Sequence, residues 1–234
     1  MRAYFLIIIA EFEVSLANKS KLNKEGPQFT AQDQFYVKSL ECLKSVYGDE
    51  SSALGDLLST ISASKAVSGS ISESIDWAGK ALLSRITNFG YVHSKTADSH
   101  YNLGLLYRLN FEFKSSLKEL KICREIRKSL IPLDPLSIAE CDFSIAYTAK
   151  LIGLPAEALL GYYLCARTRC KNLGVSHAKS IQALRALYKQ KDAMNSTEKI
   201  LLGVEIKDKI EELGWDRNGQ SESGSLINHN NLFF

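Results

Sequence analysis

A chain of 234 residues with 45% hydrophobic and 24% charged residues has the composition of a globular protein with a buried core. Its net charge of +3 is spread over 29 basic and 26 acidic residues, so the composition excludes the concentrated positive charge that a nucleic-acid-binding protein usually carries. Only 4 prolines and 14 glycines occur, which leaves long segments free of helix breakers.

The chain begins with an apolar run over 3–10 that is too short to span a bilayer. The run could form the core of a signal peptide, but two glutamates follow it at once and no small-residue cleavage site lies nearby. We therefore favour a buried helix over about 2–18. Residues 30–47 carry a helical apolar pattern, so the sequence predicts a degenerate N-terminal helix pair over 1–47.

A 42-residue period runs through the rest of the chain. A large apolar residue followed by a helix terminator recurs at Tyr47-Gly48, Phe89-Gly90, Ile131-Pro132 and Leu173-Gly174. A turn column between these points holds Gly69, Phe111, Gly153 and Asn195. Glycine and asparagine tolerate the left-handed conformation that ends a helix, so at Phe111 we expect the neighbouring Asn110 to take this role after a shift of one residue.

Each period therefore predicts a helix, a turn, a second helix and a longer connector. We place four such units at 48–89, 90–131, 132–173 and 174–215, followed by a polar tail over 216–234 that we expect to be disordered. The fold class is all-α, since no segment alternates with the period of two that a strand requires. A small-residue column, Ser62, Gly104 and Ala146, is expected to let paired helices approach closely.

The last repeat is expected to end in a helix with apolar residues on one side only. Four apolar residues of the last helix form one stripe, as in a terminal helix whose outer face meets water: Leu202, Ile206, Ile210 and Leu213. The five cysteines form no metal-binding spacing. We expect reduced, mostly buried thiols in a cytoplasmic protein.

Two segments resemble the tetratricopeptide repeat (TPR). The run Tyr101-Asn102-Leu103-Gly104-Leu105-Leu106-Tyr107 is similar to the Leu-Gly-x-x-Tyr signature, and Gly153-Leu154-Pro155-Ala156-Glu157-Ala158-Leu159 is similar to the turn and the start of the second helix. The 42-residue length and the connector from Leu173 to His177 resemble the subclass found in kinesin light chains and nephrocystin-like proteins. The resemblance implies a right-handed α-solenoid of antiparallel helix pairs, the TPR-like superhelix, and an association with the cytoskeleton or the cilium.

The resemblance also implies that the first helices of successive units line a concave peptide-binding groove. The repeat register places ten residues there: Asp98, Tyr101, Leu105, Arg108, Glu140, Phe143, Tyr147, Lys150, Arg185 and Lys189. The aromatic rings would hold apolar side chains of a peptide, and the basic residues would hold its carboxylates by charge-assisted hydrogen bonds. In the alternative interpretation the rings stack between units and the charges are only solvated.

Catalysis is not indicated. His93 and His177 are equivalent connector residues two periods apart, so we expect each to cap the following helix rather than to form a catalytic pair. His100 is expected to pack against a neighbouring helix. No nucleophile elbow and no phosphate-binding loop occur. The sequence therefore predicts no enzyme, no cofactor and no metal site.

The function expected from these patterns is that of an adaptor, a protein–protein interaction module whose groove binds a peptide with aromatic and acidic residues. Its partner would be a protein or peptide, with no nucleic acid and no membrane insertion. Two alternatives stay open: a self-assembling structural scaffold that dimerises through its N-terminal apolar patch or its last helix, or a regulatory fragment of a larger complex.

Overall fold

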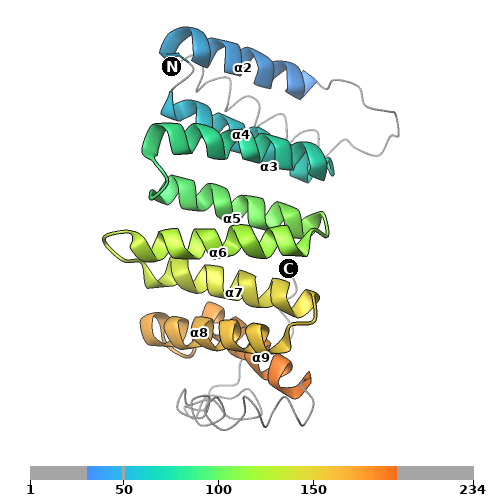
Figure 1. The fold of residues 1–234 in the computed structure, drawn as a ribbon, viewed down its shortest axis with the longest axis vertical. Helices are drawn as coiled ribbons and strands as arrows, with labels where there is room; N and C mark the ends of the chain where they lie inside the picture. The colour runs from blue at the N-terminus through green and yellow to red at the C-terminus, as the bar shows by residue number, and fades with distance from the viewer. Residues whose placement is uncertain (1–30, 49–50, 194–234) are drawn as a thin grey trace. The chain divides into compact units, whose positions relative to one another are not determined.

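The computed structural model describes residues 31–48 and 51–193, and within them the chain forms eight α-helices and no strand (Figure 1). The helices are α2 (Ala31–Tyr47), α3 (Ser52–Val67), α4 (Ile71–Phe89), α5 (Ser94–Leu109), α6 (Phe113–Ser129), α7 (Pro135–Leu151), α8 (Pro155–Leu173) and α9 (Ala178–Ala193). The predicted all-α class is confirmed. The helix predicted over 2–18, the stripe of the last helix and the tail over 216–234 lie outside the described residues.

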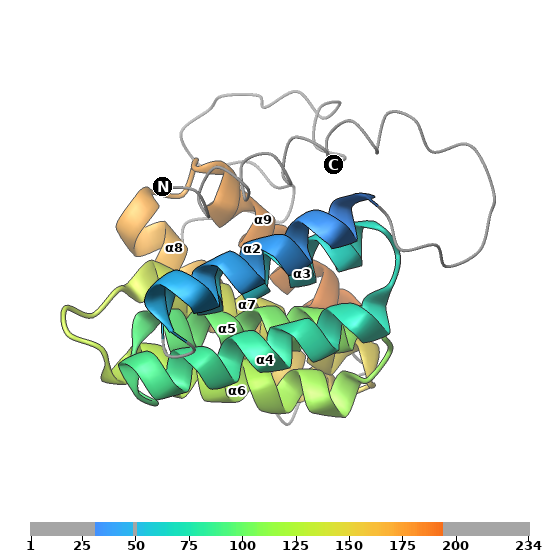
Figure 2. The same cartoon turned by 90° about the horizontal axis from the view of Figure 1, so that it is seen from above.

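The chain divides into two compact parts, 1–126 and 127–234, and each is described by itself. We call them the first unit and the second unit from here on, and we call the 42-residue segments repeats. In the first unit α3 packs against α4 and α4 against α5 (Figures 1 and 2). In the second, α7 packs against α8 and α8 against α9. The second helices α4, α6 and α8 begin at intervals of 42 residues, at Ile71, Phe113 and Pro155. The division into four repeats, a degenerate N-terminal pair and a tail remains a prediction.

The paired helices approach closely at the predicted small-residue column. Between α3 and α4, Ser62 Oγ donates to the Ser74 carbonyl at 2.8 Å and Ser74 Oγ donates to the Ser62 carbonyl at 2.7 Å. Between α5 and α6, a Cβ added to Gly104 would lie 2.7 Å from Leu120 Cγ. Such distances leave no room for a larger side chain, so the small residues are a packing requirement.

Each unit has its own buried core. In the first, Tyr36 and Leu43 of α2 pack with Leu57 and Ile61 of α3. In the second, a larger cluster joins α7, α8 and α9 and includes the fully buried Cys165. Burial raises the pKa of the Cys165 thiol to about 12. None of the five cysteines forms a disulfide, and three of them are buried and two half-buried, which agrees with the predicted burial.

The turn column holds its register at Gly69, Phe111 and Gly153, while Asn195 lies outside the described residues. One expectation about the column is wrong. Phe111 itself takes the left-handed conformation, with φ +61°, whereas Asn110 has φ −84°. The Phe111 amide donates to the Arg108 carbonyl at 3.1 Å and the Glu112 amide donates to the Tyr107 carbonyl at 2.8 Å. The turns at Gly69 and Gly153 have the same pair of bonds. These backbone bonds fix the turn and outweigh the conformational preference of phenylalanine.

Replacing Phe111 by glycine is therefore expected to raise the free energy of unfolding by about 1 kcal/mol, since a left-handed conformation costs an L side chain roughly that much. The ring is 80% exposed, so little packing is lost with it. Urea denaturation of the two proteins measures the difference. Gly69→Ala should lower the stability by a similar amount, and equal stability of all three proteins would contradict this account.

Candidate functional site

In the first unit, helix α5 presents four of the predicted groove residues on one face. Asp98, Tyr101, Leu105 and Arg108 follow one another at intervals of three, four and three residues, which places them on one side of a helix. Asp98 is exposed and the other three are half-buried, whereas the opposite face of α5 is buried against its neighbours. The stripe thus runs from an acid, over an aromatic and an aliphatic side chain, to a base.

In the second unit, α7 repeats this spacing with Glu140, Phe143, Tyr147 and Lys150, and a second aromatic side chain takes the place of the aliphatic one. Phe143 is half-buried because its ring meets the Tyr162 ring edge to face, with 5.4 Å between the centroids. Tyr147 keeps 43% of its surface exposed, and Glu140 and Lys150 are exposed as well. The Phe143 ring is therefore partly packed against α8, while Tyr147 reaches solvent.

Helix α9 carries the last two predicted residues. Arg185 is half-buried and Lys189 is exposed, one helical turn apart on the same side of the helix. The ten predicted residues therefore fall into one stripe on each of three first helices: one in the first unit and two in the second. Their assignment as peptide contacts remains a prediction.

The two connector histidines cap helices, as predicted. His93 Nδ1 accepts from the Lys95 amide at 3.1 Å, and His177 Nδ1 accepts from the Lys179 amide at the same distance. In the intervening connector the equivalent position holds a proline at the first residue of α7, and the cap moves to Asp134, whose Oδ1 accepts from the Leu136 amide at 3.0 Å.

Sequence reasoning missed a buried arginine that recurs every 42 residues. The arginine column, as we call it, consists of Arg85, Arg127 and Arg169, of which only 7–8% is exposed. Each Nη1 donates to a backbone carbonyl ten residues further on, at 3.2 Å to Lys95, 2.7 Å to Ser137 and 3.0 Å to Lys179. Each arginine thus ties the end of a second helix to the start of the next first helix.

The first arginine also belongs to a closed trio of charges. Asp56 accepts from Arg85 Nη2 at 3.1 Å and from Lys95 Nζ at 2.8 Å. Partial burial by itself raises the pKa of the Asp56 carboxyl, but the hydrogen bonds and charges of Lys95 and Arg85 together hold it below its usual value of 3.8. We call Asp56, Arg85 and Lys95 the closed trio.

This lowered pKa predicts an acid-dependent loss of stability. A carboxylate with a lowered pKa in the folded state stabilises the fold above pH 3.8, and the contribution is lost as the pH falls through the lowered value. The free energy of unfolding of the unaltered chain should therefore exceed that of Asp56→Asn by a constant amount near neutral pH, and this difference should shrink as the pH falls below 3.8 through the lowered pKa. Urea denaturation at a series of pH values tests this, and an advantage that persists in acid would contradict it.

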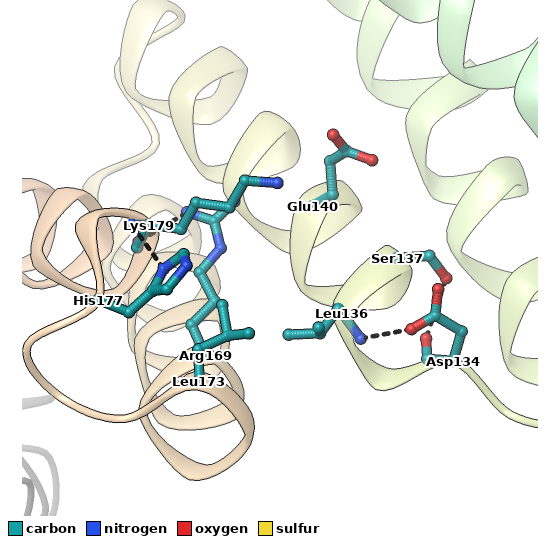
Figure 3. Close-up of a pocket in the computed structure, with 8 residues that line it drawn as sticks. All are labelled: Asp134, Leu136, Ser137, Glu140, Arg169, Leu173, His177 and Lys179. Carbon is teal, nitrogen blue, oxygen red and sulfur yellow. Dashed lines mark hydrogen bonds between the residues drawn. The ribbon is translucent and has the colours of Figure 1, made fainter.

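A pocket of about 350 Å³ lies in the second unit, between the start of α7 and the connector from α8 to α9 (Figure 3). Figure 3 shows Arg169, His177 and Lys179 gathered on one side of it and the α7 residues on the other. Its lining consists of Asp134, Leu136, Ser137, Glu140, Arg169, Leu173, His177 and Lys179. Charges of both signs and two leucines therefore face one small space.

The described ranges contain neither a candidate metal site nor a candidate membrane span. No group of three His, Cys, Asp or Glu side chains there could hold a metal ion. No helix among residues 31–48 and 51–193 is long and apolar enough to cross a membrane. His100 is buried, with its Nδ1 2.7 Å from Glu119 Oε2 on α6, so it packs against a neighbouring helix as predicted.

Comparison with known proteins gives a result at the level of structure. No family model and no curated protein matches the sequence. Two crystal structures of nearly identical TPR-like repeats from a putative kinesin light chain of Podosopora anserina, one of them a variant with a single substitution, match with TM-scores of 0.65 and 0.66. Both are 13% identical to this chain, cover 91% of it and are themselves covered to 94% and 92%. The fold is that of TPR-like repeats.

A third solved structure agrees with this assignment. The crystal structure of BtubC (BKLC) from P. vanneervenii matches with a TM-score of 0.65 at 14% identity, over 97% of this chain and 99% of that one. The predicted resemblance to kinesin-light-chain-like TPR repeats is thus confirmed for the fold. The neighbours found are repeat proteins, so the comparison agrees with the 42-residue spacing of α4, α6 and α8.

Proposed function

We propose that this TPR-like chain is an adaptor that binds a peptide with aromatic and acidic residues along the exposed stripes of its first helices. The observation that carries the proposal is the repeated order of side chains on α5 and α7. Each stripe places an acid, an aromatic ring, a second large side chain (Leu105 on α5, Tyr147 on α7) and a base at the same helical spacing. A helix surface that only needs solubility has no reason to repeat this order.

The chemistry of the stripe fits such a peptide. Tyr101 and Leu105 are half-buried and Tyr147 is exposed, so apolar surface is available next to charge. Arg108 and Lys150 stand at the C-terminal ends of their helices, where a carboxylate of the peptide can pair with them. We further propose that the chain acts in the cytoplasm in association with the cytoskeleton, and the name of one structural neighbour, a putative kinesin light chain, supports the cytoskeletal part.

Charge reversal tests the proposal. The variant carrying Arg108→Glu and Lys150→Glu should lose binding of a fluorescent peptide that contains one tryptophan among glutamates by more than about tenfold, because each reversal replaces an attraction by a repulsion. Fluorescence anisotropy measures the affinity, and raising the salt concentration should weaken the binding to the unaltered chain.

The matched control carries Lys118→Glu and Arg167→Glu, which reverse exposed charges on the second helices α6 and α8. It has the same net charge as the test variant, so a general electrostatic effect would weaken both proteins alike. Equal affinities of the two variants would show that the stripes do not bind the peptide. The scaffold alternative depends on residues outside those described, and no observation on the described residues favours it over the adaptor.

A further inference from the structure

The pocket in the second unit contains the same three charges as the closed trio of the first unit, but in an open state. Glu140, Arg169 and Lys179 stand two periods after Asp56, Arg85 and Lys95, on the corresponding helices. Arg169 keeps the backbone bond of the arginine column, to the carbonyl of Lys179 at 3.0 Å. No ion pair joins Glu140 to Arg169 or Lys179 within the described residues.

Two differences from the closed trio leave Glu140, Arg169 and Lys179 without ion pairs to one another within the described residues. The Glu140 carboxylate is instead paired with Arg127, with 3.4 Å between Nη1 and Oε2. The position of Phe89, whose ring stacks on His93 with 4.5 Å between the centroids and lies 5.2 Å from Lys95 Nζ, is taken by the smaller Leu173. In the closed trio a carboxylate pairs with both cations and a ring lies beside the lysine, whereas in the pocket the Glu140 carboxylate pairs with Arg127 and Leu173 stands in the place of the ring.

Donors remain available in the pocket. The Lys179 ammonium has no hydrogen-bond partner among the described residues. Arg169 Nη1 is used by the Lys179 carbonyl and by Gln182 Oε1, while its Nη2 donates no bond within the described part of the chain, although Arg169 is more than nine-tenths buried. His177 Nδ1 accepts a backbone bond, so its neutral ring carries the proton on Nε2.

We infer that this pocket binds a carboxylate side chain of a peptide, in the position that Asp56 occupies in the closed trio. Arg169 and Lys179 would donate to the carboxylate, and Leu136 and Leu173 would contact an adjacent apolar side chain. Asp134 and Glu140 also line the pocket, and their negative charges favour a singly charged carboxylate over a doubly charged phosphate. The inference rests on the proposed peptide-binding function and assigns one contact of it.

The experiment uses the full chain, labelled with nitrogen-15, and three capped dipeptides: acetyl-Leu-Glu-amide, acetyl-Leu-Gln-amide and acetyl-Leu-phosphoserine-amide. The Leu-Glu peptide should shift the backbone amide signals of His177 and Lys179 and saturate, whereas the Leu-Gln peptide should not. Lys179→Met should weaken the Leu-Glu peptide about tenfold, the loss expected for one charge-assisted hydrogen bond. Leu173→Phe should abolish binding because it restores the ring of the closed trio.

The matched control is Lys171→Met, which removes an exposed lysine of α8 outside the pocket and should leave the affinity unchanged. Equal binding of the Leu-Gln peptide, tighter binding of the phosphoserine peptide, or an unchanged affinity of Lys179→Met would each overturn the inference. Lys179 is exposed, so this variant should fold even where Leu173→Phe does not.

The pocket and the groove can fail separately. If the dipeptide fails while the longer acidic peptide still responds to charge reversal on the stripes, the pocket assignment alone is overturned. If the dipeptide binds as expected and the longer peptide ignores the charge reversal, the pocket stands and the groove is overturned.

Discussion

Arg85→Met is expected to lower the free energy of unfolding by about 2–3 kcal/mol, the largest effect expected for the first unit. Arg85 is 8% exposed, and its guanidinium donates to the Lys95 carbonyl, to Ser99 Oγ at 2.7 Å and to Asp56. Methionine keeps most of the buried stem, so the loss reports the hydrogen bonds rather than a cavity. Because Asp56 is half exposed, it can regain water, which keeps the loss at the lower end for a buried ion pair.

The matched control is Lys95→Met. Its ammonium pairs with the same carboxylate at 2.8 Å, but 40% of the side chain is exposed, and the substitution leaves the backbone carbonyl in place. An exposed ion pair of this kind contributes at most about 1 kcal/mol. Urea denaturation of both variants separates the two contributions. Equal losses would show that the arginine acts only as a surface charge and that its backbone bond is unimportant.

Gly161→Val is expected to destabilise the second unit by about 2–3 kcal/mol. A Cβ on this residue would lie 2.9 Å from the Asp142 carbonyl oxygen and 2.9 Å from Ala146 Cβ, both on α7. The carbonyl belongs to the backbone of a helix, so relief requires α7 and α8 to move apart along their contact. Thermal unfolding followed by circular dichroism should show a lower midpoint, with α-helical content retained below the transition.

Gly79 on α4 supplies the comparison, since a Cβ there meets nothing within 4 Å. Gly79→Ala should raise the stability by about 1 kcal/mol through its better helix propensity alone. If Gly161→Val lowers the stability and Gly79→Ala raises it, then packing and not helix propensity requires glycine at position 161. A stabilising effect of both substitutions would contradict the close approach of α7 and α8.

Much of the fold could be predicted because the period is expressed in residues with strong local preferences. Gly69 and Gly153 mark turns by conformational freedom, and His93 and His177 mark helix starts by their side-chain acceptors. Phe111 shows the limit of this reasoning. The expectation followed the preference of its neighbour Asn110, but the two backbone bonds of the turn kept the register and imposed a positive φ on a phenylalanine.

The site was less predictable, for two different reasons. The arginine column is visible as an identical residue every 42 positions, but fold patterns are expressed in apolar, small and turn residues, and a charged residue late in a helix suggests solvent. The pocket could not be found from sequence, because it depends on where the Glu140 carboxylate points and on the volume between Leu173 and its neighbours. Both follow only from packed side chains.

Each residue of the arginine column donates a hydrogen bond to a main-chain oxygen atom. This leaves the side chains of the accepting residues free to vary in sequence. The accepting residues are Lys95, Ser137 and Lys179, and each keeps its own side chain out of the bond. A substitution at one of these positions therefore changes the side chain that the surface presents to other molecules and keeps the hydrogen bond from the arginine to the main chain. Within the ranges that the structure describes, the Lys95 ammonium pairs with Asp56 and the Lys179 ammonium pairs with no side chain, although the carbonyls of both residues accept a bond from the arginine column. Recognition and assembly can thus change independently at one residue position.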